Sequence, residues 1–279
     1  MQVNSVVKLR IALMDKTLYR YRPINDLTIE GLERSEFYFI SPEDFNDPFD
    51  CKNIFTFDSA DDNDFRKFFQ GQLRYKFPSL SPREVNEKVE SIIKSGSYRT
   101  KEAQAAQLRI WRDILDEESN KLGLVCFSKN PNDILMWSHY SAKHSGICLK
   151  FDQDILESRF FCARVHYSQK YPTFKEFVAR LNRSGLKSVY QIFLLTKSTH
   201  WRYEKEYRLI EDPSRRTDVR GERKYTYPEE ALVGIIWGCQ TSDKNKEKIR
   251  EALKNRTHPI TYYRAEKSES SYSVRIVEA

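Results

Sequence analysis

The sequence predicts an α+β fold, as a single domain with a small mixed or antiparallel sheet and an inserted helical lobe. Short apolar runs typical of strands are interspersed with segments of helical spacing, without the regular alternation that produces a parallel sheet. Helical spacing dominates residues 61–122, which we interpret as the lobe within a domain that spans residues 1–279. With 279 residues and 39% hydrophobic content, the chain can bury a core.

Cap signals and apolar periodicity locate the elements in order. Asn25 or Asp26 can cap a first helix, and Ser81-Pro82-Arg83-Glu84 combines a capping serine with proline and glutamate at their preferred positions. These patterns predict helices over residues 25–32, 81–93, 103–122, 173–181, 186–196 and 242–255. Strands are predicted over residues 18–23, 36–40, 122–128, 146–151, 161–167, 204–210, 231–237, 260–264 and 272–277.

The loop at residues 41–50 contains the sequence FNDPFD. Its Pro, Asn and Asp content predicts an Asx-turn that projects Asp47 or Asp50. The alternative is a rigid turn that closes onto the core through Phe45 and Phe49.

Several classes of protein are excluded by composition. No apolar run approaches the length of about 20 residues that spans a bilayer, so we expect a cytoplasmic protein without a membrane partner. Five cysteines without CxxC spacing favour buried reduced thiols over disulfides or zinc, and no metal is expected. The Walker and Rossmann glycine motifs are missing from the sequence.

Charge is distributed unevenly along the chain. Residues 1–64 hold 7 basic and 13 acidic residues, whereas the whole chain has a formal net charge of +7. The remainder is therefore basic and could attract nucleic acid or a polyphosphate-bearing molecule. Solvated helix faces are the alternative, since the charges are interleaved.

The clearest polar pattern is WRYEKEYR at residues 201–208. On a strand, Glu204, Glu206 and Arg208 lie on one face, and the two carboxylates need a cation. Arg208 itself could balance these carboxylates. Arg20 and Arg22, which also share a strand face, could do so as well. The pattern predicts either a structural ion pair or a ligand site built from the same charges.

A second pattern is MWSHY at residues 136–140. Beside Trp137 and Tyr140, His139 could act as an acid or base near neutral pH, and His144 lies five residues later, a spacing unlike that of zinc ligands on a helix. Trp137, Trp201 and Trp237 could form a stacking platform for single-stranded nucleic acid, or else belong to the core.

Four stretches together resemble the DUF2971 family of bacterial proteins. They are LYRYRPIN at 18–25, FYFISPEDFNDPFDC at 37–51, GLVCFSKN with ILMWSHYSAKHSGICLKFD within 123–152, and WRYEKEYRLI at 201–210. The family is named as one of unknown function, and the resemblance implies a bacterial or phage-related cytoplasmic protein, with members often near defence genes.

The order of these residues is also similar to the Arg-Ser-Glu pattern of ADP-ribosyltransferases. That similarity implies that Arg20 or Arg22 holds the pyrophosphate of NAD and that Ser128 orients the nicotinamide ribose. Glu206 would stabilise the oxocarbenium-like centre, and Glu204 would position the nucleophile. We expect Trp137, Tyr140 and His139 in the same pocket.

Three hypotheses follow from the sequence. The first is an ADP-ribosyltransferase-like enzyme with NAD as co-substrate, acting on a nucleic-acid or protein acceptor as a defence or toxin effector. The second is a nucleic-acid-binding protein without transferase activity. The third is a non-enzymatic scaffold or sensor in which the charges form structural ion pairs.

Overall fold

A computed structural model describes residues 16–52, 55–119, 121–211 and 223–279. The chain forms two compact units. The first contains the described residues up to Ile40 together with Gly123–Val165 and His200–Ala279, and the second contains Ser41–Leu122 and His166–Thr199. The predicted helical range 61–122 therefore lies in the second unit, which also includes a later segment of the chain.

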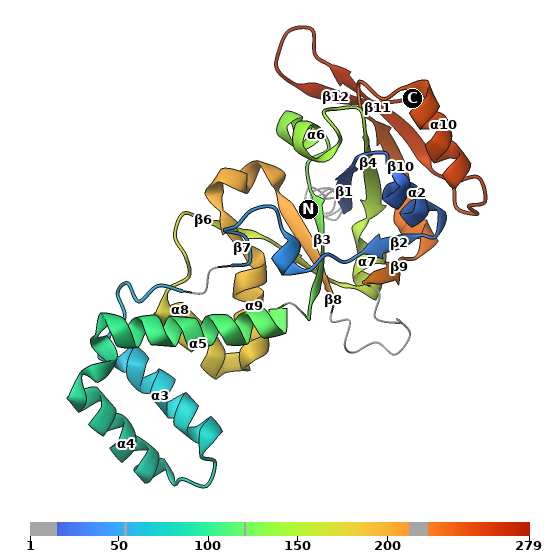
Figure 1. Ribbon diagram of the computed structural model, residues 1–279. Coiled ribbons are helices and arrows are strands. Elements are labelled where there is room, and N and C mark those ends of the chain that lie inside the picture. Colours follow the sequence, from blue (N-terminus) through green and yellow to red (C-terminus); the bar gives the residue numbers. More distant parts are fainter. Residues whose placement is uncertain (1–15, 53–54, 120, 212–222) are drawn as a thin grey trace, which may run out of the picture. The chain divides into compact units, whose positions relative to one another are not determined.

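The first unit is built on an eight-stranded sheet with the order β12-β11-β10-β4-β1-β3-β8-β5 (Figure 1). Neighbouring strands are antiparallel except for the parallel pair β10 and β11, so the predicted mixed sheet is confirmed. The strands are β1 (Thr17–Arg22), β3 (Gly123–Ser128), β4 (Ile147–Asp152), β5 (Phe161–Arg164), β8 (Glu206–Glu211), β10 (Leu232–Trp237), β11 (Thr261–Lys267) and β12 (Val274–Glu278).

One side of this sheet, which we call the α2 face, carries the larger core. Helices α2 (Asp26–Glu33), α7 (Gln153–Arg159) and α10 (Asp243–Ala252) pack there, together with the two-stranded ribbon of β2 (Glu36–Tyr38) and β9 (Lys224–Thr226) and the short turn η5 (Glu229–Ala231). Asn25 is the N-cap of α2 and accepts a hydrogen bond from the Thr28 amide, as its residue type predicts. Leu18 of β1 points into this core.

The opposite side, which we call the α6 face, is covered by the short helix α6 (Ile134–Tyr140). Met136 and Trp137 of this helix pack on Tyr19 and Tyr21 of β1. Successive strand residues point to opposite faces, so β1 contributes to both cores. The turn η3 (Thr199–Glu204) leads into β8.

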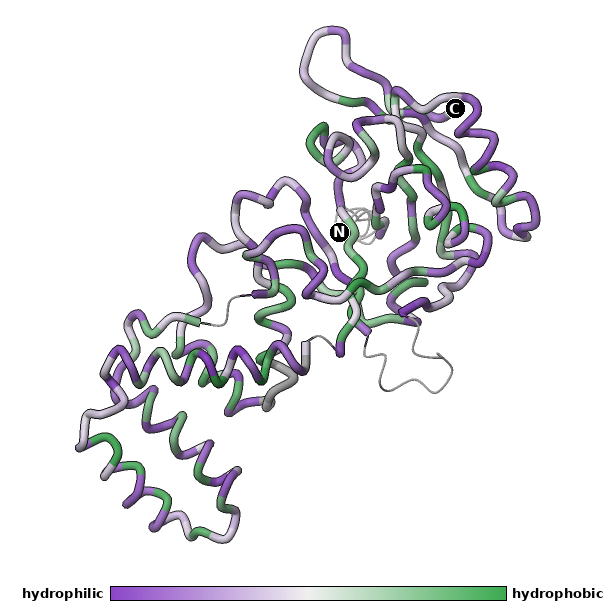
Figure 2. The backbone as a smooth tube through the Cα atoms, in the orientation of Figure 1, coloured by the Kyte–Doolittle hydropathy of each residue, from purple (hydrophilic) through white to green (hydrophobic). Residues whose placement is uncertain are grey.

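The second unit is mainly helical. Its elements are η1 (Pro42–Asp44), α3 (Asp62–Lys76), α4 (Pro82–Ser95), η2 (Ser97–Arg99), α5 (Lys101–Ser119), α8 (Phe174–Ser184), α9 (Leu186–Leu195) and the parallel pair β6 (His166–Ser168) and β7 (Thr196–Ser198). Hydrophobic and hydrophilic residues alternate along its helices (Figure 2). The buried side chains include Phe68, Trp111, Phe174 and Phe177, so much of the aromatic content of the chain belongs to this core.

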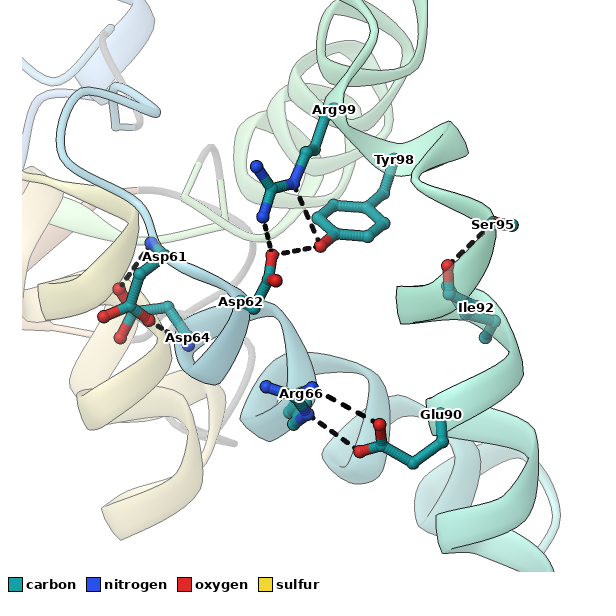
Figure 3. A network of polar contacts seen from close by, with 9 residues as sticks. All are labelled: Asp61, Asp62, Asp64, Arg66, Glu90, Ile92, Ser95, Tyr98 and Arg99. Atoms are coloured by element: carbon teal, nitrogen blue, oxygen red, sulfur yellow. Dashed lines mark hydrogen bonds and ion pairs between the residues drawn. The ribbon is translucent and has the colours of Figure 1, made fainter.

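Polar contacts join α3, α4 and η2 (Figure 3). Arg66 pairs with Glu90 at 2.7 Å, and Asp62 accepts hydrogen bonds from both Tyr98 and Arg99. The predicted capping box is present at the start of α4, because the Ser81 side chain accepts from the Glu84 amide and Glu84 bonds back to the Ser81 amide. The exposed ion pair contributes little to stability.

Two predicted strands differ from the structure. The strand expected over residues 204–210 begins at Glu206, because Thr199–Glu204 forms a 3-10 turn. The strand expected over residues 161–167 is divided into β5 and β6, which belong to different units. In the described ranges, no helix has both the length and the apolar character needed to cross a membrane.

Candidate functional site

A buried ion pair lies on the α6 face of β8. The Arg208 Nε donates to Glu206 Oε1 at 2.7 Å, and the second guanidinium nitrogen donates to Glu206 Oε2 at 3.2 Å. The side chains of Arg208 and Glu206 are 0% and 3% exposed. Each charge is therefore compensated inside the protein by two parallel hydrogen bonds, as the alternative of pairing with Arg208 predicts.

A second carboxylate, that of Glu204, is linked to α6 and β3. The Tyr140 hydroxyl donates to Glu204 Oε1 at 2.7 Å, and the Ser128 hydroxyl donates to the Glu204 carbonyl oxygen at 2.6 Å. Glu204 and Ser128 are buried, whereas Tyr140 is half-buried. The phenol therefore connects a buried carboxylate to the outer part of the α6 face.

Lys205 has a left-handed backbone with φ of 46°. Its carbonyl oxygen accepts a hydrogen bond from the Lys129 amide at 3.1 Å. This residue ends the 3-10 turn and starts the strand, so Glu204 and Glu206 belong to different elements although both contribute to the α6 face. The prediction that both carboxylates lie on one face is therefore correct, but its reason is wrong. The two residues do not alternate along one strand, because Glu204 belongs to the 3-10 turn and Glu206 to β8.

Trp137 is part of the core of the α6 face. It is fully buried, its Nε1 donates to the Pro131 carbonyl at 2.9 Å, and its ring meets Tyr21 edge-on at 5.1 Å. Burial raises the pKa of Tyr21, whose hydroxyl donates to the Asn130 carbonyl. Trp137 therefore packs between α6 and the sheet, and neither face of its ring is exposed for stacking a base.

The two histidines of this region differ in their surroundings. His139 is exposed, with its ring 6.2 Å from that of Tyr140. His144 stacks on Trp137, and its Nε2 lies 3.1 Å from the Ser138 hydroxyl. Burial, with the charge of Lys267, lowers the pKa of His144.

The turn that holds His144 is left-handed. Ala142, Lys143 and His144 have φ of 48°, 54° and 68°, a conformation that residues with a side chain rarely adopt. The His144 amide donates to the Trp137 carbonyl, and the Gly146 amide donates to the Ser141 carbonyl. Nothing local in the sequence signals this turn, so only the spacing of His144 from His139 could be considered in advance.

The chain matches the DUF2971 family over residues 136–209. That family is described as "Protein of unknown function (DUF2971)". No curated protein and no solved structure matches the chain. The DUF2971 resemblance is thus confirmed over a segment that begins in α6 and ends in β8, while the similarity to ADP-ribosyltransferases stays a prediction.

Arg20 and Arg22 precede the DUF2971 segment and point to the other side of the sheet. Arg20 lies against two rings of the α2 face, with its guanidinium carbon 5.2 Å from the centre of Phe37 and 6.0 Å from that of Phe127. The Arg22 Nε donates to the Thr28 hydroxyl at 3.3 Å. Both arginines therefore share a face, as predicted.

The expected Arg-Ser-Glu constellation is consequently divided. Tyr19 pairs with Ser128, and Ser128 pairs with Glu206, which places both of these predicted site residues on the α6 face. Arg20, one residue after Tyr19, points the opposite way. The structure brings Ser128, Glu204, Glu206 and Tyr140 together and leaves the arginines outside this group.

The FNDPFD loop lies in the second unit, outside the DUF2971 segment. The Asp47 Oδ1 accepts from the Phe49 amide at 2.9 Å, so the predicted Asx-turn is present. Phe49 is 63% exposed, and closure of the loop through this ring is therefore wrong. Asp50 lies 3.4 Å from the Lys197 ammonium in a buried ion pair.

None of the five cysteines, all of which the structure describes, forms a disulfide, and the predicted burial holds for two of them. Cys51 and Cys148 are buried, and the other three are partly exposed. Burial raises the pKa of the Cys148 thiol and raises that of Cys162 to about 12, so these two thiols are protonated and unreactive at neutral pH. Within the described ranges, no three His, Cys, Asp or Glu side chains are grouped to hold a metal.

Proposed function

We propose that the DUF2971-like segment carries a glycosyl-transfer site on the α6 face, with NAD as the donor and Tyr140 and Glu204 as its acid–base pair. The observation that supports this proposal is the 2.7 Å hydrogen bond from the half-buried phenol to the buried carboxylate. A phenol backed by a carboxylate can accept a proton from a substrate hydroxyl while passing its own proton inward.

In the proposed reaction the bond between the ribose C1′ and the nicotinamide nitrogen breaks. Nicotinamide leaves with the electron pair of that bond, and an acceptor hydroxyl or water forms a new bond to C1′. The proton of this nucleophile goes to the Tyr140 oxygen as the phenol proton moves to Glu204. Both carboxylate oxygens of Glu206 are bonded by Arg208 and its side chain is buried, so we assign Glu206 a structural role and no contact with the ribose.

Several residues take roles that differ from those expected from the sequence. The Ser128 hydroxyl donates to the Glu204 carbonyl oxygen, so it fixes the backbone of Glu204 and does not orient a ribose. Trp137 supports α6 from below, and the exposed His139 lies at the rim beside Tyr140. Arg20 and Arg22 have no part in this site.

The test is release of nicotinamide from NAD by the purified full chain. We expect Tyr140→Phe and Glu204→Gln each to lower the rate by about 10²–10⁴-fold, the range of acid–base catalysis. Glu211→Gln is the matched control, because it changes the same residue type at the far end of the adjoining strand β8, with its side chain toward the α2 face, and its rate should equal that of the wild type. No release by the wild type would contradict the proposal and leave a structural role for the cluster.

The second candidate function is binding of single-stranded nucleic acid. The predicted platform of tryptophans is wrong for two members, because Trp137 and Trp237 are 0% and 3% exposed. A different feature favours this function. At the end of α3, Tyr75 is 90% and Phe77 is 44% exposed, and the cation of Lys76 lies 5.7 Å from the Phe77 ring.

Exposed rings beside cations are suited to stack bases and to neutralise phosphates. Binding of a fluorescent single-stranded oligonucleotide should therefore weaken as salt rises, and Tyr75→Ala should lower affinity by about 5-fold or more. Tyr272→Ala is the matched control, since Tyr272 is 100% exposed but lies among serines and Glu269. Equal loss in both variants, or no binding at low salt, would contradict this function.

A further inference from the structure

The α2 face contains two adjacent arginines without a carboxylate. Arg20 and Arg22 lie two residues apart on the same face of β1. Arg20 contacts the Phe37 and Phe127 rings, and Arg22 donates to the Thr28 hydroxyl. Within residues 16–52, 55–119, 121–211 and 223–279, neither guanidinium forms an ion pair. The two positive charges on this strand face are therefore uncompensated by the chain that the structure describes.

Uncompensated charge of this kind is costly. Removing an ion from water costs several kcal/mol unless a partner answers it, and two like charges side by side add to that cost. Burial and the neighbouring charge of Arg22 lower the pKa of Arg20, and burial lowers that of Arg22. Arginine nevertheless stays charged at neutral pH, so the cost persists in the folded protein.

Arg20 and Arg22 are half-buried, and two arginines of the same unit with more deeply buried side chains have partners. Arg208 is held by Glu206 through two hydrogen bonds. The Arg256 side chain is 7% exposed, lies 3.7 Å from Glu229 and donates to its carbonyl oxygen. The first unit thus supplies acceptors for these guanidiniums, and among the described residues the pair on β1 is an exception that a bound anion would explain.

We infer that Arg20 and Arg22, with Tyr227, form a binding site for a small phosphate-bearing anion. A phosphate group carries about −1.5 to −2 charges at neutral pH and balances two guanidiniums. The planar fork of arginine pairs with two phosphate oxygens at once. This site is separate from the Tyr140 and Glu204 pair, because the two lie on opposite faces of the sheet.

Tyr227 supplies a neutral donor to this site. It is buried, and its ring stacks on Phe37 with centroids 4.4 Å apart, the same ring that Arg20 contacts. Burial raises the pKa of Tyr227 to about 12, although Arg256 and Arg20 oppose that rise. A hydrogen bond with the Ser35 side chain also opposes the rise. At neutral pH the phenol keeps its proton, but it has to exchange its contact with Ser35 to donate to an anion.

Thermal unfolding of the full chain tests this inference. At equal ionic strength, the wild type should gain about 2–4 °C or more in Tm when millimolar phosphate replaces chloride, because a ligand that binds only the folded state stabilises it. Arg20→Met should lose this gain. Arg34→Met is the matched control, since Arg34 is exposed on the neighbouring helix end and pairs with Glu30, and it should keep the gain.

Direct titration covers the case in which Arg20→Met fails to fold. ³¹P NMR of inorganic phosphate should show broadening with the wild type that Arg22→Lys weakens, because lysine keeps the charge but loses the planar fork. A parallel series with adenosine monophosphate distinguishes free phosphate from a phosphate ester as the bound form. Absence of both the Tm gain and the NMR broadening, with either anion, would overturn the inference.

Discussion

The two faces of the eight-stranded sheet handle buried charge in different ways. On the α6 face, Glu206 is bound by Arg208 and Glu204 by Tyr140. On the α2 face, Arg20 lies against aromatic rings and Arg22 reaches a threonine. The arginines of the α2 face come from β1 and the Glu206–Arg208 pair from β8 of the same sheet, with β3 between them, so the contrast lies in the pairing of the charges. A paired cluster is complete by itself, whereas an unpaired one indicates a missing partner.

The largest expected effect comes from breaking the pair on the α6 face. Arg208→Met removes the guanidinium that bonds both oxygens of the buried Glu206 carboxylate and should lower the free energy of unfolding by about 3–5 kcal/mol. Urea denaturation measures this loss. The double variant Arg208→Met with Glu206→Met is the control and should recover most of the stability; an equal loss in both variants would show that packing, not charge, is responsible.

Tyr140→Phe should have the next largest effect. It removes one hydrogen bond to the buried Glu204 carboxylate while keeping the ring, which costs about 1.5–3 kcal/mol for a bond to a charged group. Urea denaturation again provides the measurement. Tyr263→Phe is a suitable control, because Tyr263 packs against the same core and its hydroxyl has no hydrogen-bond partner among the residues that the structure describes. A loss of less than about 0.5 kcal/mol for Tyr140→Phe would make the bond dispensable.

On the α2 face the same type of substitution should cost little. In phosphate-free buffer, Arg20→Met removes a charge that has no carboxylate partner among the described residues, and the free energy of unfolding should stay within about 1 kcal/mol of the wild type or rise. The comparison with Arg208→Met is made in one series of urea curves. If both variants lose several kcal/mol, the contrast between the two faces fails.

The smallest effect concerns pH. Because the pKa of His144 is lowered in the folded protein, the unfolded chain binds a proton near pH 6.5 that the folded protein binds only at lower pH. Stability should therefore fall as pH drops below about 6.5. His144→Asn suits the left-handed backbone and should make the Tm between pH 7.5 and pH 5.5 less pH-dependent; an unchanged slope would exclude His144 as its source.

Local signals predicted most elements of the fold. Ser81 and Glu84 mark the start of α4 through contacts within four residues, and Asn25 marks α2 in the same way. The strand prediction at residues 204–210 missed the start of β8 because the left-handed Lys205 is set by the hydrogen bond from Lys129, far away in the chain. Such a conformation has no local signature in a lysine.

The site was harder to predict than the fold for a related reason. Period two correctly placed Arg20 with Arg22, and Glu206 with Arg208, on shared faces. Which face of the common sheet each pair takes depends on the strand order β1-β3-β8 and on the register of Tyr19 with Ser128. Neither the strand order nor the register can be read from a short segment of sequence. The prediction that the arginines and glutamates lie in one site was therefore wrong.

The central position of β1 has a consequence for synthesis of the protein. This strand pairs with β4 on one edge, where Thr17 meets Asp152, and with β3 on the other. Both partners lie more than 100 residues later, so a ribosome needs on the order of ten seconds to produce them. During that interval the apolar and aromatic side chains of β1 and both its edges lack their native cover, which makes this strand a natural binding site for chaperones.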